Sequence, residues 1–300
     1  MISAKIAYRL VQRILLGASA GTAVAAQGAP VHAMWVWKSP TVLAQPNAAQ
    51  NLMAFCRANG INEIYISVYG TMDATGQVRL DQLIGILHNG SVRVDALFSS
   101  TDADEGGAHL QKLLGEVQAI ETFNQKHPQQ KFDGIHLDIE PQQRPENKGS
   151  GNLAFLPGLV NAYTQVKQLS AKDGLPVNAD IQTKLLKGSA DQRKMLLTAL
   201  PAMTLMLYEL SSPTDGQSTD AKESKLRSES QKYLQMAEEG LDAAQLARIA
   251  IGLRTPDYGD LLPLMPQVLD QANGADPIYA GRARHSYNDV LPTAGSASPN

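Results

Sequence analysis

The chain has 300 residues, of which 43% are hydrophobic, and 26 Lys and Arg against 29 Asp and Glu give a net charge of −3. This composition suits one large globular domain or two small ones and excludes a disordered chain. The charge balance offers no basic surface for a phosphate backbone, so we expect no nucleic-acid partner. The one cysteine, Cys56, cannot form an internal disulfide and lies in a helical pattern, which predicts a small buried residue.

The first 26 residues have the parts of a secretory signal peptide. Lys5, Arg9 and Arg13 are basic, and residues 14–26 are apolar or small, as a signal peptidase requires. This stretch is too short to span a bilayer core of about 30 Å, and no second apolar run follows, so we expect no membrane span. An ordinary amphipathic first helix is the alternative. The sequence therefore predicts an exported protein, either periplasmic or secreted.

From residue 31 to 290, short β-branched runs alternate with amphipathic stretches, the pattern of parallel β/α units. Eight runs are predicted strands, the number that closes a single-domain α/β fold, the (β/α)8 TIM barrel. An open doubly wound sheet is the main alternative, but it needs a glycine-rich phosphate turn that the chain lacks. Residues 291–300 are predicted to form a disordered tail. The predicted strands are residues 31–37, 61–69, 92–99, 132–140, 176–182, 203–210, 248–253 and 277–287.

Helical patterns lie between these strands, for example at residues 47–58, 107–125, 153–169 and 223–239.

The first three predicted strands carry candidate functional residues. Trp35 and Trp37 share a face of the first strand, so both could stack on a sugar ring, although Trp also fills the interior of wide barrels. Tyr69 ends the second strand and is a candidate substrate contact. Asp95 on the third strand is predicted to be an internal hydrogen-bonding residue.

The fourth predicted strand carries three ionisable side chains on one face. Because side chains alternate along a strand, His136, Asp138 and Glu140 point one way and the apolar residues between them the other. In a barrel the polar set faces the interior, with Glu140 at the C-terminal rim where barrel active sites lie. Two crowded carboxylates raise the pKa of one of them, which can then act as a neutral acid. A buried ion-pair network without chemistry is the alternative.

The same strand resembles a known family. The run from Phe132 to Glu140 is similar to the D-G-x-D-x-D-x-E signature of the family 18 glycoside hydrolases, the chitinase family, whose members are (β/α)8 barrels. Residues 206–209 on strand 6 look like that family's M-x-Y-D, and residues 251–253 on strand 7 extend the resemblance. Four residues match the signature on strand 4: Asp133, Gly134, Asp138 and Glu140.

This resemblance implies a retaining glycoside hydrolase that cleaves an N-acetylated glycan and uses no cofactor. Glu140 would protonate the glycosidic oxygen. Asp138 would hold the substrate's N-acetyl group while its carbonyl oxygen attacks the anomeric carbon, so that the substrate supplies the nucleophile. Tyr208 would steady the same acetamido group, and Met206 would point inward beside it.

The chain departs from the family pattern at three places. His136 stands where the signature has its innermost Asp, which alters the proton relay behind Asp138. Glu209 replaces an Asp and is one methylene longer. Strand 8 lacks the tryptophan that commonly floors the family's sugar site and offers His285 and Tyr287 instead. The chain is therefore interpreted as a divergent relative, and a catalytically inactive barrel that binds a glycan or a protein is the alternative.

The remaining strands add further candidates. Asp180 on strand 5 lies near the predicted rim, where it would contact substrate or pair with Glu140. Arg282 and Arg284 alternate on strand 8; facing inward they would neutralise carboxylates or bind an acidic sugar, and facing outward they would extend between helices. We expect substrate contacts from Trp35, Trp37, Tyr69, His136, Asp180, Met206, Glu209 and His285.

Two other chemistries fit less well. Many retaining glycosidases place an acid Glu on strand 4 and a nucleophilic Glu at the end of strand 7, but residues 252–256 contain no Glu. A metal site would draw on His136, Asp138 and Glu140. Metal-dependent barrel hydrolases, however, typically begin with an H-x-H on strand 1, where this chain has only His32, so we expect no metal.

Overall fold

A computed structural model describes residues 30–148, 153–208, 216–239, 241–258 and 263–291. The predicted signal peptide and residues 292–300 of the predicted tail lie outside this part of the chain. Contacts divide the chain into residues 1–30 and a compact unit that begins at Val31 and is treated below. Of the helices in the described ranges, none combines the length and apolar character needed to cross a bilayer.

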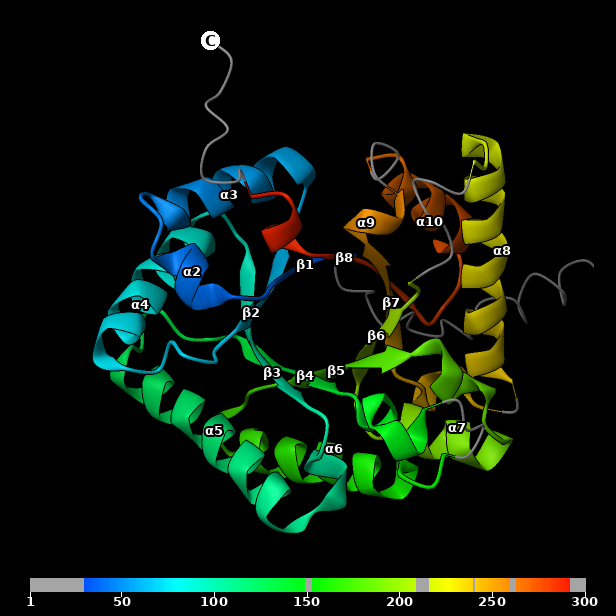
Figure 1. Cartoon of the computed structure of the whole chain (residues 1–300), viewed down its shortest axis with the longest axis horizontal. Coiled ribbons are helices and arrows are strands. Elements are labelled where there is room, and N and C mark those ends of the chain that lie inside the picture. Colours follow the sequence, from blue (N-terminus) through cyan, green and yellow to red (C-terminus); the bar gives the residue numbers. More distant parts are fainter. Residues whose placement is uncertain (1–29, 149–152, 209–215, 240, 259–262, 292–300) are drawn as a thin grey trace, which may run out of the picture. The chain divides into compact units, whose positions relative to one another are not determined.

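Eight parallel strands form the centre of the molecule. Each strand pairs with the next and β8 pairs with β1, so the sheet closes into a barrel (Figure 1). The predicted single-domain (β/α)8 TIM barrel is confirmed. The strands are β1 (Val31–Val36), β2 (Glu63–Ser67), β3 (Arg93–Ser100), β4 (Gly134–Ile139), β5 (Val177–Gln182), β6 (Ala202–Met206), β7 (Arg248–Arg254) and β8 (Tyr279–His285).

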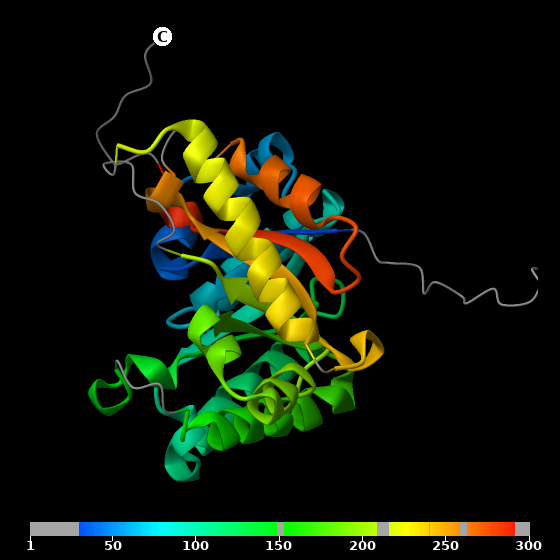
Figure 2. The same cartoon turned by 90° about the vertical axis from the view of Figure 1, so that its right-hand side faces the viewer.

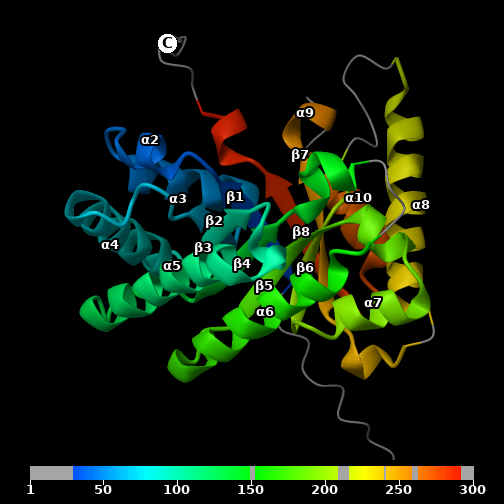
Figure 3. The same ribbon diagram turned by 60° about the horizontal axis from the view of Figure 1, so that its bottom comes forward.

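Helices follow the strands and surround the barrel (Figure 1). Figure 2 shows α8 across the outside of the barrel beside α10, and Figure 3 shows α5 beside α6. The helices are α2 (Ser39–Leu43), α3 (Ala48–Asn59), α4 (Ala74–Asn89), α5 (Gly107–Lys126), α6 (Leu156–Ser170), α7 (Ala190–Leu197), α8 (Thr219–Glu238), α9 (Thr255–Tyr258) and α10 (Met265–Asn273).

One interval of this outer ring has no helix of its own. Helices α3 to α8 follow β1 to β6 in turn, and α10 follows β7. After β8, the residues that the structure describes form only the short 3-10 turn Tyr287–Asp289. The outer face of β8 and β1 therefore lies between α3 and α10 (Figure 1).

Local sequence explains these helices. In α5, Leu110, Leu113, Val117 and Ile120 recur at intervals of three and four residues, which places them on one buried face against the barrel. Helix α3 ends where Gly60 adopts φ 62°, a left-handed conformation that glycine reaches without a steric penalty. The predicted burial of Cys56 on α3 is confirmed, since its side chain is fully buried.

Alternating strand residues form two separate cores. The outward set packs against the helices, and the inward set forms a small cluster of Ala33, Trp35, Tyr65, Leu97 and Ala283. The register continues this interior face around the sheet. For example, Leu97 pairs with His136 and Ser99 with Asp138, so the polar side chains of β4 point into the barrel.

The lower barrel interior is filled by a charged network. The guanidinium of Arg93 lies 2.7 Å from Asp95 Oδ1 and 3.4 Å from Glu63 Oε1, and Asn178 Nδ2 donates to Asp95 Oδ2 at 3.0 Å. The internal role predicted for Asp95 is confirmed. A Cβ on Gly134 would lie 2.8 Å from Asp95 Oδ1 and 2.9 Å from the carbonyl oxygen of residue 176, so this position has room only for glycine.

The strand ends differ from those predicted at functionally important places. Strand β4 ends at Ile139, and Glu140 begins a 3-10 turn over Pro141–Gln143 instead of extending the strand. Pro141 causes this ending because it has no N–H to continue the ladder. Strand β8 covers residues 279–285 and not 277–287. Its alternation places Arg282 and Arg284 on the outer face, so they do not neutralise the interior carboxylates.

Candidate active site

The carboxyl groups of Asp138 and Glu140 lie at the C-terminal end of β4. Asp138 is 8% exposed, and Glu140 is half-buried just beyond the strand. Burial, together with the nearby carboxylates of Asp180 and Glu140, raises the pKa of Asp138 well above its usual value. Its Oδ1 atom is buried without a hydrogen-bond partner among the residues that the structure describes. Asp138 is therefore shifted toward its protonated form beside Glu140.

Three side-chain amides hold the Glu140 carboxyl. Gln182 on β5 donates to Oε1 at 2.6 Å and Gln142 donates to the same oxygen at 3.2 Å, while Gln143 donates to Oε2. Burial raises the pKa of Glu140, and the Asp180 carboxylate adds to the rise, whereas the amide hydrogen bonds oppose it. The amides fix the carboxyl at the rim, while burial favours its protonated form.

A fully buried group lies beneath this pair. His136 Nε2 is 2.9 Å from Asp180 Oδ1, and Trp35 Nε1 donates to Asp180 Oδ2 at 2.9 Å. The His136 ring stacks on Tyr65 with 3.6 Å between ring centroids. Trp35 and His136 have no exposed surface. Trp35, His136 and Asp180, all predicted to contact substrate, lie beneath the carboxyl pair. Trp35 and His136 offer no surface to a ligand.

Aromatic and polar side chains from the last strands close the other side of the rim. Tyr208 follows β6, and burial raises its pKa well above the usual value, with the carboxylates of Asp180, Asp138 and Glu140 adding to the rise. The ring centroid of His285 on β8 lies 5.7 Å from that of Tyr208.

The ring centroid of Trp37 lies 6.2 Å from that of His285. Met206 is 9% exposed on the inward face of β6. Glu209 lies outside the described residues.

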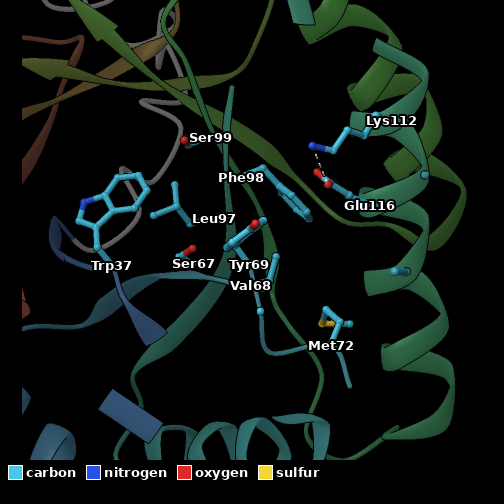
Figure 4. Close-up of a pocket in the computed structure, with 13 residues that line it drawn as sticks. Trp37, Ser67, Val68, Tyr69, Met72, Leu97, Phe98, Ser99, Lys112 and Glu116 are labelled. Atoms are coloured by element: carbon cyan, nitrogen blue, oxygen red, sulfur yellow. Dashed lines mark ion pairs between the residues drawn. The ribbon is translucent and has the colours of Figure 1, made fainter. Parts of the chain in front are cut away.

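A cavity of about 590 Å³ opens beside the site, above β2 and β3 (Figure 4). Trp37 and Tyr69 contribute aromatic surface to it, and Tyr69 is 82% exposed. Lys112 and Glu116 on α5 form an ion pair at its outer wall. Ser99 on β3 also lines the cavity and pairs in register with Asp138 on β4. The cavity therefore begins on the strand next to the one that carries Asp138.

Sequence reasoning missed four residues of the site: the amides Gln142, Gln143 and Gln182 that hold Glu140, and the aromatic residue Tyr163. Gln182 lies two positions after Asp180 on the inward face of β5, and this spacing was the available signal. Tyr163 on α6 is fully buried, and its hydroxyl donates to the backbone oxygen of Asp180 at 3.4 Å. Its helical position gave no sign that its hydroxyl reaches the backbone of β5.

The matched residue Asp133 has a structural position far from the rim. Its Oδ2 accepts from the backbone N–H of Val94 at 2.7 Å and lies 2.9 Å from His88 Nε2. Asp133 therefore joins β3 to the start of β4. Within the described ranges, no three His, Cys, Asp or Glu side chains have the arrangement of a metal site.

Comparison with solved structures gives the architecture a context. A family 18 chitinase from Pseudoalteromonas aurantia superposes with a TM-score of 0.52 at 9% identity, over 86% of this chain and 94% of that one. The spore cortex-lytic enzyme SleL from Bacillus megaterium matches with a TM-score of 0.50 at 14% identity, over 75% of this chain and 50% of that one. The chain has the fold of the family 18 glycoside hydrolases. The resemblance seen on strand 4 is confirmed at the level of fold.

Catalytic domain 2 of the Ostrinia furnacalis Group II chitinase matches with a TM-score of 0.45 at 13% identity, over 75% of this chain. The chain spans 63% of the length of that domain. No protein-family model matches the sequence, and no curated protein matches it.

Proposed function

We propose that this chain is a retaining glycoside hydrolase that cleaves N-acetylated glycans with help from the substrate's own acetamido group. The observation that carries the proposal is the buried pair of carboxyl groups at the end of β4, one of them with an unpartnered oxygen among the described residues. The fold shared with a family 18 chitinase and with SleL supports it. Residues 1–26 direct export of the protein to a compartment where such glycans occur.

Glu140 acts as the general acid. Its raised pKa keeps a proton on the carboxyl in the range where a free glutamate would have lost it. The amides of Gln142, Gln143 and Gln182 hold the group, so that the proton points to the position of the glycosidic oxygen. General acid catalysis of this kind contributes about 10²–10⁴ in rate.

Asp138 acts on the acetamido group of the sugar on the glycone side of the cleaved bond. Its Oδ1 accepts the amide N–H, which orients the carbonyl oxygen for attack on the anomeric carbon. The attack expels the leaving sugar, which takes the Glu140 proton, and forms a cyclic cation whose N–H donates to Asp138 Oδ1. Water activated by the Glu140 carboxylate then opens this cation. The Tyr208 hydroxyl, which lies near the same carboxylates, steadies the acetamido oxygen.

Trp37 and the cavity that it shares with Tyr69 accept the sugars on one side of the cleaved bond. A sugar ring stacks favourably on an aromatic face, and Trp37, the residue that follows β1, lines the cavity. The His285 ring lies 6.2 Å from that of Trp37 and 5.7 Å from that of Tyr208, and we assign it the role of the expected tryptophan floor. These residues make the binding surface short, which suits an oligosaccharide chain better than a crystalline polymer.

The proposal is tested by incubating the protein with chitin-type, peptidoglycan-type and de-N-acetylated oligosaccharides. We expect cleavage of the N-acetylated substrates alone, with the β-anomer formed first in the product NMR spectrum. Equal cleavage of de-N-acetylated substrates, or formation of the α-anomer first, contradicts acetamido participation. Binding without any cleavage would establish the alternative, a barrel that binds glycans without catalysis.

A further inference from the structure

A second pocket lies outside the barrel, at the interval of the ring where no helix follows β8. Its volume is about 270 Å³, and it is lined by residues from β1, β8, the end of α3 and the start of α10. The pocket is remote from the carboxyl pair, because Arg282 and Arg284 point outward from β8 while His285 points into the barrel. Its chemistry is also different, since the charged side chains that line it are cationic.

The guanidinium of Arg284 is incompletely satisfied. It is half-buried, its Nε donates to Thr255 Oγ1 at 3.4 Å, and its Nη1 donates to Asn59 Oδ1 at 3.5 Å. Both bonds are long, and Nη2 has no acceptor among the described residues. No carboxylate lies within 4.0 Å of it in that part of the chain. The ring of Phe55 lies 5.7 Å away and holds the guanidinium in place by a cation–π contact.

Arg282 also has donors to spare. Its Nη1 pairs with Asp270, whereas its Nη2 faces His32 Nδ1 at 3.4 Å. His32 Nδ1 is 3.1 Å from the carbonyl oxygen of Gly60, and a carbonyl only accepts, so this nitrogen carries a hydrogen. Two donors then face each other, and Arg282 Nη2 remains without an acceptor.

The Asp270 carboxylate pairs with Arg282, and the Asp289 carboxylate acts on Arg284 only from beyond 4.0 Å, so no carboxylate bonds directly to the Arg284 guanidinium. Burial lowers the pKa of both arginines, which reflects the cost of holding these charges away from water. Pro266 and Gln267 from the first turn of α10 also line the pocket, and the N-terminal end of a helix adds a further positive potential.

We propose that this pocket binds an oxyanion, a phosphate group or a carboxylate, through the free N–H groups of Arg282 and Arg284. The fork of a guanidinium matches two oxygens of either group. The volume admits one such group with a small substituent. The site is independent of glycan cleavage, so a failure here leaves the proposed hydrolase untouched, and the reverse also holds.

The test follows the Nε–Hε NMR signals of Arg282 and Arg284 during titration with inorganic phosphate and, separately, acetate, at constant ionic strength set with sodium chloride. We expect saturable shifts. The variant Arg284→Gln should weaken binding at least tenfold, which corresponds to about 1.4 kcal/mol. Saturation by phosphate alone indicates a phosphate ester as the natural ligand, and saturation by acetate alone indicates a carboxylate.

The matched control is Arg57→Gln. Arg57 lies in the last turn of α3, next to residues that line the pocket, but its own side chain does not line it, so the variant removes one positive charge nearby. It should leave the affinity unchanged. If Arg284→Gln unfolds, Arg284→Lys preserves the charge without the fork and should still bind several-fold more weakly than the wild type. The proposal is overturned if neither anion produces saturable shifts, or if Arg57→Gln and Arg284→Gln weaken binding equally. Either result would mean that Arg284 simply extends between the helices to reach water.

Discussion

His136 Nε2 lies 2.9 Å from Asp180 Oδ1 in the interior of the barrel, where the family signature has an aspartate in place of the histidine. An aspartate at this position would add a fourth carboxyl group to Asp138, Glu140 and Asp180. The imidazole instead approaches one oxygen of Asp180, whose other oxygen accepts a hydrogen bond from Trp35. The substitution therefore places an imidazole, and not a further carboxyl group, behind Asp138.

The hydrogen bond from Trp35 to Asp180 predicts that Trp35 on β1 and Trp37, just beyond it, contribute differently to stability. Trp35→Phe removes the donor and leaves Asp180 Oδ2 buried without a partner, so it should lower the free energy of unfolding by about 1–3 kcal/mol. In Trp37→Phe no such bond is lost, because Trp37 Nε1 has no hydrogen-bond partner in the described part of the chain. Its loss should be under about 1 kcal/mol. Urea denaturation compares the two, and equal losses would refute the role given to Asp180.

Asp138→Asn should raise stability at neutral pH while it abolishes most turnover. The folded state holds a proton on Asp138 above the pH at which the unfolded chain releases it. Wild-type stability therefore falls as the pH rises through the interval between these two pKa values. The asparagine variant does not titrate, so its advantage should be small near pH 4 and larger near pH 8. Urea unfolding at the two pH values measures it, and an advantage that shrinks with rising pH would show that Asp138 is ionised in the folded protein.

Glu63 provides a test far from the rim. Burial first, and the neighbouring Asp95 carboxylate second, raise its pKa from 4.5 to about 8, although Arg93 opposes the rise. Relative to Glu63→Gln, the wild type should lose stability between pH 4.5 and 8, by at most about 1.4 kcal/mol per pH unit. Thermal unfolding of both proteins across this range checks the slope. A difference that does not vary with pH would mean that the ion pair with Arg93 keeps Glu63 charged.

The pattern of strand β4 could be recognised in the sequence because its side chains alternate with a period of two. That period alone places His136, Asp138 and Glu140 on one face. Most of the strands were equally readable as short β-branched or apolar runs between amphipathic stretches, although β8 contains no β-branched residue. The barrel closure followed from their number.

Other features depend on the register between strands, which a single sequence does not specify. Gln182 reaches Glu140 because β5 lies beside β4 and because Glu140 lies just beyond the end of β4, where Pro141 begins a 3-10 turn. The burial of Trp35 depends on the stagger that places Tyr65 and His136 around it. The side chain of Arg282 could be placed on the outer face only once the pairing of β8 with β7 and β1 was known.

If Glu140 is the general acid, the effect of removing its proton depends on how much protonation the leaving group needs. Turnover of Glu140→Gln should be measured on an N-acetylated oligosaccharide and on the matching aryl glycoside, whose leaving group needs little protonation. Glu146→Gln is the matched control, because Glu146 lies six residues further along and its side chain is 62% exposed.

We predict that Glu140→Gln lowers turnover of the oligosaccharide by about 10²–10⁴-fold and that of the aryl glycoside far less. Glu146→Gln should match the wild type on both substrates. An N-acetylglucosamine-derived thiazoline, which mimics the cyclic intermediate, should still bind to Glu140→Gln, and this binding confirms that the site is intact. Oligosaccharide turnover within tenfold of the wild type in Glu140→Gln, or an equal loss on both substrates, would contradict the assignment of Glu140 as the acid.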